Sequence, residues 1–105
     1  DRPYTAREGQ VSGITCEIEP AQDGGLVLRT KIDLPSTGDP EHVVVEAGNP
    51  QVWVAEPDSM RDGGSLYAST RLVHVNGGSF VLDRSQLRFT VIGTSRAVGI
   101  QGCAR

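Results

Sequence analysis

Residues 13–35, GITCEIEPAQDGGLVLRTKIDLP, contain the clearest structural pattern in the sequence. On either side of the central PAQDGG, apolar and polar side chains alternate, as they do in strands that bury one face and expose the other. Within this centre, Gly24 and Gly25 can adopt positive φ values without steric cost. The stretch therefore predicts an antiparallel β-hairpin formed by strands at 13–20 and 26–35.

The same two-residue alternation recurs along the rest of the chain. Further strands are expected at 42–48, 51–56, 65–75, 79–82, 87–93 and 97–103. The NGG at 76–78 predicts a hairpin between the strand before it and the strand after it. PDSMRDGG at 57–64 is expected to be a loop, and DRSQ at 83–86 a single helical turn capped by Asp83. No stretch has the apolar periodicity of a longer helix.

Seven or eight short strands at roughly ten-residue spacing indicate an all-β fold. We expect an antiparallel β-sandwich, with a small β-barrel as the alternative. The 105 residues fit a single domain, 1–105, in which 1–10 is expected to be a loosely ordered N-terminal segment.

The two cysteines lie near opposite ends of the chain. Cys16 has the parity of the apolar residues in its strand, so its side chain should face the core. Cys103 has the opposite parity to the apolar residues of the last strand, but a glycine bulge at Gly102 would shift the alternation by one residue. We therefore expect a Cys16–Cys103 disulfide that joins the first and last strands. Two separate buried thiols are the alternative.

The predicted disulfide indicates where the protein works, because such bonds persist in oxidising compartments. We expect a periplasmic or extracellular protein, whereas two free thiols would fit the cytosol. The sequence begins with Asp1 rather than Met, which we interpret as removal of an export signal or trimming of the chain. No apolar run reaches the ~18 residues that a membrane-spanning helix needs.

In general architecture, this strand pattern resembles immunoglobulin-like exported domains. The interval between Cys16 and Cys103 is much longer than that of the usual inter-sheet bond of such domains, and Trp53 is not followed by a tyrosine-corner pattern. The resemblance therefore implies a sandwich of this kind and no particular family.

The charge distribution argues against nucleic acid as a partner. The net charge is −3, and nine of the ten basic residues are arginines, no two of which are adjacent. Nucleic-acid binding needs a basic stripe that neutralises several phosphates, and the sequence contains none.

No motif for catalysis, a cofactor or a metal stands out. Ser95 lies outside a Gly-x-Ser-x-Gly elbow, and no Gly-Lys-Ser/Thr follows a glycine cluster. DSMRDG at 58–63 is similar to the start of a calcium-binding EF-hand loop, but Met60 and Ser69 occupy ligand positions that need oxygen-rich side chains. We expect an ordinary turn there, no cofactor and no bound metal.

The two histidines could form a metal site only if their strands paired. His42 and His74 would then meet near Glu41 or Asp39, but nothing in their spacing requires it. We expect these histidines to be pH-sensitive or simply solvated.

Trp53, Tyr67 and Arg71 are the candidate binding residues, because these residue types are enriched in binding hot spots. If Val52 and Val54 point inward, Trp53 points outward, and pairing of the two strands would create a binding platform. The alternative places Trp53 in the core, as the only tryptophan of a small sandwich, and we favour that placement. For Tyr67 the pattern favours neither position.

Taken together, these features predict a small exported binding or assembly module, with no evident catalytic chemistry, that recruits a protein or other ligand through an exposed strand face or edge. A small secreted hydrolase or carbohydrate-active enzyme is the first alternative. Its paired carboxylates would come from Glu17, Glu46, Glu56 and Asp58. The second is a secreted enzyme inhibitor that presents Met60 and Arg61 at the tip of a loop over 56–64.

Overall fold

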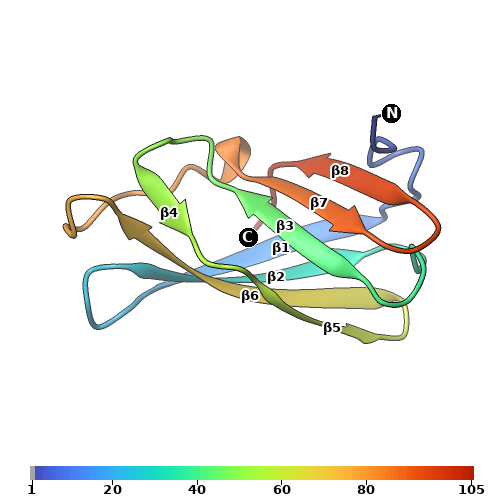
Figure 1. Ribbon diagram of the computed structural model, residues 1–105, viewed down its shortest axis with the longest axis horizontal. Helices are drawn as coiled ribbons and strands as arrows, with labels where there is room; N and C mark the ends of the chain where they lie inside the picture. The colour runs from blue at the N-terminus through green and yellow to red at the C-terminus, as the bar shows by residue number, and fades with distance from the viewer. Residues whose placement is uncertain (1) are drawn as a thin grey trace.

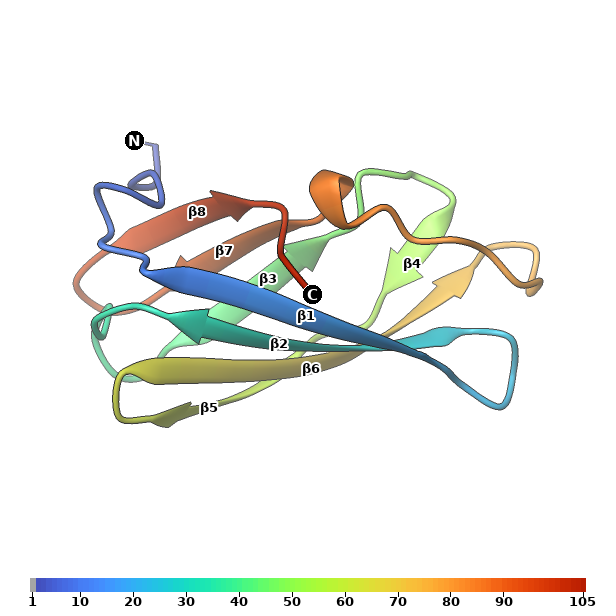
Figure 2. The ribbon, with the colours of Figure 1, turned by 180° about the vertical axis from the view of Figure 1, so that it is seen from behind.

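The computed structural model, which describes residues 2–105, consists of two antiparallel sheets packed face to face (Figures 1 and 2). The larger sheet contains β1 (Gly13–Pro20), β2 (Leu26–Asp33), β6 (Ser65–His74), β4 (Val52–Val54) and β5 (Asp58–Asp62). The smaller sheet contains β3 (His42–Glu46), β7 (Arg88–Ile92) and β8 (Ala97–Gln101). Both sheets of the described chain are open, which confirms the predicted sandwich over the barrel alternative.

In the larger sheet, β2 pairs with one edge of β6. Both β4 and β5 pair with the other edge, β5 with the first half of β6 and β4 with its last residues. β1-β2-β6-β4 facing β3-β7-β8 is the ABED and CFG order of the constant-type immunoglobulin sandwich. The resemblance in general architecture thus extends to strand order.

Alternating side chains from both sheets form one shared core. Its buried apolar residues include Cys16, Leu28, Ile32, Val43, Val45, Leu66, Leu72, Phe89, Val91, Val98 and Ile100. Phe89 on β7 is the largest of the fully buried side chains. The preferred prediction of a core position for Trp53 is wrong, because β4 pairs with β6 so that Val52 and Val54 face inward and Trp53 faces outward.

The predicted loop at 57–64 is wrong. Residues 58–62 form β5, which is joined to β6 by a two-residue turn, Gly63-Gly64, with Gly63 at a φ of +58°. The sequence pattern is misleading here because the inward positions of β5 hold polar residues, Ser59 and Arg61, where an ordinary half-buried strand has apolar ones.

The predicted strand at 79–82 and its NGG hairpin are also wrong. Both edges of β6 are already occupied, by β2 and by β4 with β5, so no edge remains for a following strand. Instead, 79–82 crosses to the smaller sheet, and Phe80 packs against the core with its ring 5.9 Å from that of His74. The single turn capped by Asp83 is confirmed as a 3-10 helix over Arg84–Gln86.

The predicted Cys16–Cys103 disulfide is confirmed and joins β1 of the larger sheet to the segment after β8, with a Cα–Cα distance of 5.8 Å. Gly102 redirects the chain as expected, although it follows the end of β8 instead of forming a bulge within it. Its φ is +77°, and its N–H donates to the Leu87 carbonyl. In addition to the disulfide, a backbone hydrogen bond links the two segments, in which the Cys16 N–H donates to the Ala104 carbonyl at 2.7 Å.

The two ends of the chain cover one side of the sandwich. The Tyr4 N–H donates to the Ala97 carbonyl, and the Gly99 N–H donates to the Tyr4 carbonyl, both at 2.8 Å, so the N-terminal segment lies along β8. Ala104 lies along β1 in the same way. Loose order of 1–10 stays a prediction, and Asp1 lies outside the described residues.

No helix among residues 2–105 is long and apolar enough to span a membrane.

Removing the disulfide should lower the free energy of unfolding by about 4–5 kcal/mol, because loop closure over so long an interval restricts the unfolded chain. Cys16 and Cys103 are 87 residues apart in the sequence. Urea unfolding of Cys16→Ser/Cys103→Ser measures the change, and reduced wild type should match this variant. Intact-mass measurement should show a gain of two hydrogens on reduction. A double variant as stable as oxidised wild type would contradict the assigned role of the bond.

Candidate binding site

The side of the sandwich opposite the chain ends is formed by residues 39–62, which include β3, β4 and β5; we call it the open side (Figure 1). Among the described residues, no segment other than their sheet neighbours makes backbone hydrogen bonds to β3 or β5. Residues 39–62 contain six acidic side chains and one basic one, whereas the rest of the chain contains seven acidic and nine basic. The negative charge of the protein is therefore concentrated on the open side.

Arg61 is the one basic residue of the open side, and its charge is neutralised within the fold. Its guanidinium forms a bidentate ion pair with Glu41, in which Nη2 lies 3.0 Å from Oε2, and Nη1 donates to the Leu34 carbonyl at 3.0 Å. The side chains of Arg61 and Glu41 are only 20% and 5% exposed. Arg61 therefore does not project from a loop tip, as the inhibitor alternative expects.

The ion pair gives Glu41 a strongly perturbed pKa. Burial of its carboxyl group favours the neutral form, but hydrogen bonds from Arg61 and Thr37 outweigh the burial and lower the pKa to about 2. Thr37 donates from both its N–H and its Oγ1, at 3.0 and 2.9 Å. The pair joins the loop after β2, the start of β3, and β5, and so holds the edge of the larger sheet in place.

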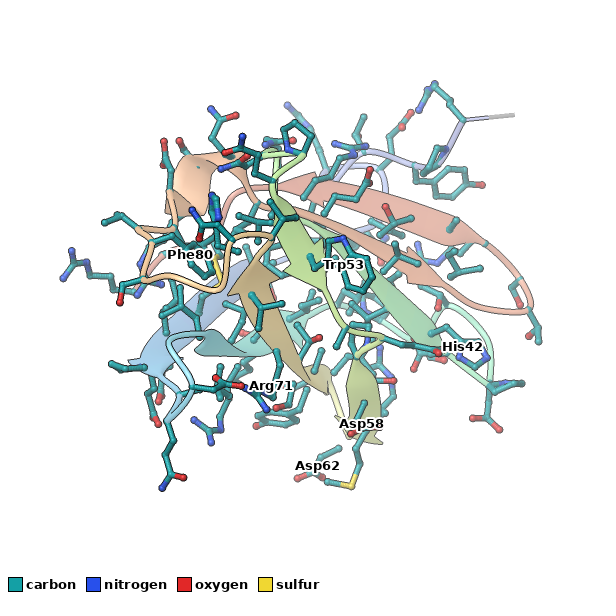
Figure 3. All side chains as sticks on the ribbon, turned by 60° about the vertical axis from the view of Figure 1, so that its left-hand side comes forward. His42, Trp53, Asp58, Asp62, Arg71 and Phe80 are labelled. Carbon is teal, nitrogen blue, oxygen red and sulfur yellow. A yellow bond between two sulfur atoms is a disulfide. The ribbon has the colours of Figure 1, made fainter. Side chains whose placement is uncertain are left out.

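The remaining carboxylates of the open side are Asp39, Glu46, Glu56, Asp58 and Asp62. All five are exposed, and none forms an ion pair within the described part of the chain. Asp58 and Asp62 project from β5 (Figure 3), and the register places Met60 between them on the same face. The open side therefore offers a charged edge whose carboxylates form no ion pair among residues 2–105.

Two large apolar side chains lie exposed on the same side. Trp53 is 71% exposed and Met60 is 69% exposed, and Tyr67 lies opposite Met60 on β6 with 41% of its surface exposed. Large exposed side chains of these types are typical of interaction surfaces. Sequence reasoning treated Met60 as part of a loop. A charge count by segment is the feature that could have identified this side as acidic.

A shallow groove of about 460 Å³ crosses the outer face of the larger sheet and reaches β5. Its walls are two rows of directly paired side chains, one formed by Lys31, Tyr67 and Met60 and the other by Arg29, Ser69 and Asp58. The small side chain of Ser69 between its longer neighbours leaves the hollow. The groove is thus continuous with the edge that carries Met60 and Asp58.

The three predicted binding residues lie on the larger sheet but do not form one patch. Trp53 pairs with Val73, and Arg71 lies two residues away from Val73 along β6, on the same outer face (Figure 3). Arg71 forms an ion pair with Asp23 in the β1–β2 turn. Tyr67 lies four residues from Arg71 along β6, beside Met60, so Trp53 and Arg71 lie towards one end of β6 and Tyr67 towards the other.

The structure does not bring together the two histidines considered for a metal site. His42 lies on β3 and His74 on β6, in different sheets. Across residues 2–105, no cluster of three or more His, Cys, Asp or Glu side chains could hold a metal ion.

Two of the carboxylates considered for the hydrolase alternative, Glu17 and Asp58, are separated by two strands. Glu17 and Asp58 line the same groove, but β2 and β6 lie between their strands. Three strand spacings amount to roughly 14 Å between backbones. Arg29 stands directly opposite Glu17 in that interval, so no observation favours a catalytic pair.

Comparison of the chain with protein-family models, with curated proteins and with solved structures finds no match in any of the three. The chemistry and geometry of the open side are therefore the basis on which we assign a function.

The Glu41–Arg61 pair should make stability depend on pH in acid. Because Glu41 has a folded-state pKa of about 2 against an ordinary value of 4.5, its contribution is complete above pH 4.5 and is lost as the pH falls towards 2. The stability advantage of wild type over Glu41→Gln should shrink by about 2–3 kcal/mol over that interval. Urea unfolding between pH 7 and pH 2 measures it.

The matched control is Glu46→Gln, an exposed carboxylate without an ion pair, which should change the stability at neutral pH by less than about 0.5 kcal/mol. An advantage over Glu41→Gln that stays constant down to the lowest pH would show that the Glu41 charge does not stabilise the fold.

Proposed function

We propose that this chain is a small exported binding or assembly module that recruits a protein partner through the open side. The observation that carries the proposal is that two exposed apolar side chains, Trp53 and Met60, lie on the same side as an acidic sheet edge that has no further strand beside it. Burying an apolar side chain of this size contributes roughly 1.5–3 kcal/mol, so two of them can drive a specific contact. The exposed carboxylates of β5, Asp58 and Asp62, then select the partner by charge.

Two further features support this proposal. The edges of β1 and β8 are occupied by Ala104 and Tyr4, so the chain ends leave the β3–β5 side as the accessible one. The disulfide supports export, because such a bond is kept in the periplasm or outside the cell and is reduced in the cytosol.

The variant Trp53→Ala/Met60→Ala should lose partner binding while keeping its fold, because both side chains are exposed and contribute little to the core. We expect its free energy of unfolding to stay within about 1 kcal/mol of wild type. Partners retained from the extracellular or periplasmic fraction of the source should fall at least about tenfold, which corresponds to 1.4 kcal/mol of lost contact. Quantitative mass spectrometry of the retained proteins measures this.

Val81→Ala/Ile92→Ala is the matched control, since both residues are exposed and apolar but lie outside the open side. It should retain the same partners as wild type. Equal retention by the Trp53→Ala/Met60→Ala variant, or equal loss in the control, would refute the assignment of binding to the open side.

A further inference from the structure

We infer that the partner of the open side is an extended basic segment of another protein, which pairs with β5 as an additional strand. This inference rests on the proposed function and specifies the chemistry of the partner. It follows from the hydrogen-bonding groups at the edge of β5, from the charges beside them, and from the order in which those charges alternate with Met60.

The turn that joins β5 to β6 determines which backbone groups face the free edge. Asp62 and Ser65 flank the two-residue turn, and the pair that closes such a turn exchanges both of its backbone hydrogen bonds. Alternation along the ladder then directs the backbone groups of Asp62, Met60 and Asp58 towards β6. Those of Ser59 and Arg61 point away from β6, and no described residue forms a backbone hydrogen bond with them.

The free edge is short and has a defined end. Beyond Asp58 the pairing with β6 shifts by one residue, because Val54 pairs with Leu72 whereas Asp58 pairs with Ser69. This bulge bends the strand at residues 55–57, which include Pro57. An incoming strand can therefore pair with residues 58–62 and no farther.

The side chains beside this edge specify what an incoming strand must carry. Asp58, Met60 and Asp62 are exposed on the outer face at alternate positions. Oppositely charged side chains directly across two strands stabilise the pair, and like charges destabilise it. The favoured segment has the pattern basic-x-apolar-x-basic, in which the two basic residues face the aspartates and the apolar residue faces Met60.

A second copy of this chain is a poor occupant of the edge. Antiparallel pairing of two β5 strands would place Asp58 opposite Asp62 twice, with Met60 opposite itself. Like charges directly opposite one another oppose such a dimer. The charges of Asp58 and Asp62 therefore disfavour self-association of β5 by repulsion and favour a basic strand by attraction.

Peptide binding tests the inference directly. The probe is a fluorescently labelled peptide that contains Lys-Thr-Val-Thr-Lys, and its control contains Glu-Thr-Val-Thr-Glu; fluorescence anisotropy gives the dissociation constants. We expect the lysine peptide to bind at least about tenfold more tightly than the glutamate peptide, from two cross-strand charge pairs. Equal affinity for the two peptides would overturn the inference.

Matched protein variants locate the contact. Asp58→Asn/Asp62→Asn should weaken binding of the lysine peptide about tenfold, because it removes both cross-strand charges. Asp39→Asn/Glu46→Gln removes two charges from the same side but none from β5, and it should weaken binding less than about twofold. Equal weakening by both variants would mean that the peptide is held by overall charge, which contradicts strand pairing.

N-methylation separates strand addition from simple charge attraction. In antiparallel pairing, the two threonine amides of the probe would face Ser59 and Arg61, so methylating them should abolish binding, whereas methylating the valine amide should preserve it. Equal effects of the two modifications would overturn strand addition. If the peptides fail while Trp53→Ala/Met60→Ala still loses its partners, this inference is wrong and the proposed function stands. If that variant also keeps its partners, both are wrong.

Discussion

The Cys16–Cys103 disulfide is the constraint on which the arrangement of this sandwich depends. It joins β1 of the larger sheet to the segment after β8 of the smaller one, and it brings Ala104 alongside β1. Because the N-terminal segment pairs with β8 on the same side, the ends of the chain occupy both strand edges there (Figure 2). The edges left for a partner are those of the open side.

On the open side, the charges and the local backbone structure both protect the edge of β5 from pairing with another copy. A free sheet edge invites pairing with another copy, and proteins commonly protect such edges with charges, prolines and bulges. β5 has all three, with Asp58, Asp62, Pro57 and the shift in register beside it. The Glu41–Arg61 pair adds the rigidity that a binding edge needs, because it holds β5 against the start of β3 and the loop after β2.

The strands that alternate cleanly could be predicted from the sequence, and so could the disulfide, because parity and the turn at Gly102 are local properties. β5 could not, since Arg61 is an inward residue whose polarity makes sense only beside Glu41, which is 20 residues away in the chain. The prediction of a strand at 79–82 was wrong because no sequence pattern shows that both edges of β6 are occupied. Trp53 was misplaced because its short strand fits either parity, and the pairing of β4 with β6 turns Val52 and Val54 inward.

Amide hydrogen exchange in the free protein tests most directly whether the chain covers one side of the sandwich and leaves the other open. The amide of Cys16, which donates to Ala104, and that of Met60, which faces β6, should exchange slowly. The amides of Ser59 and Arg61 should exchange close to the rates of an unprotected chain. Protection of Ser59 and Arg61 equal to that of Met60 would mean that the edge is already covered, and would contradict this account.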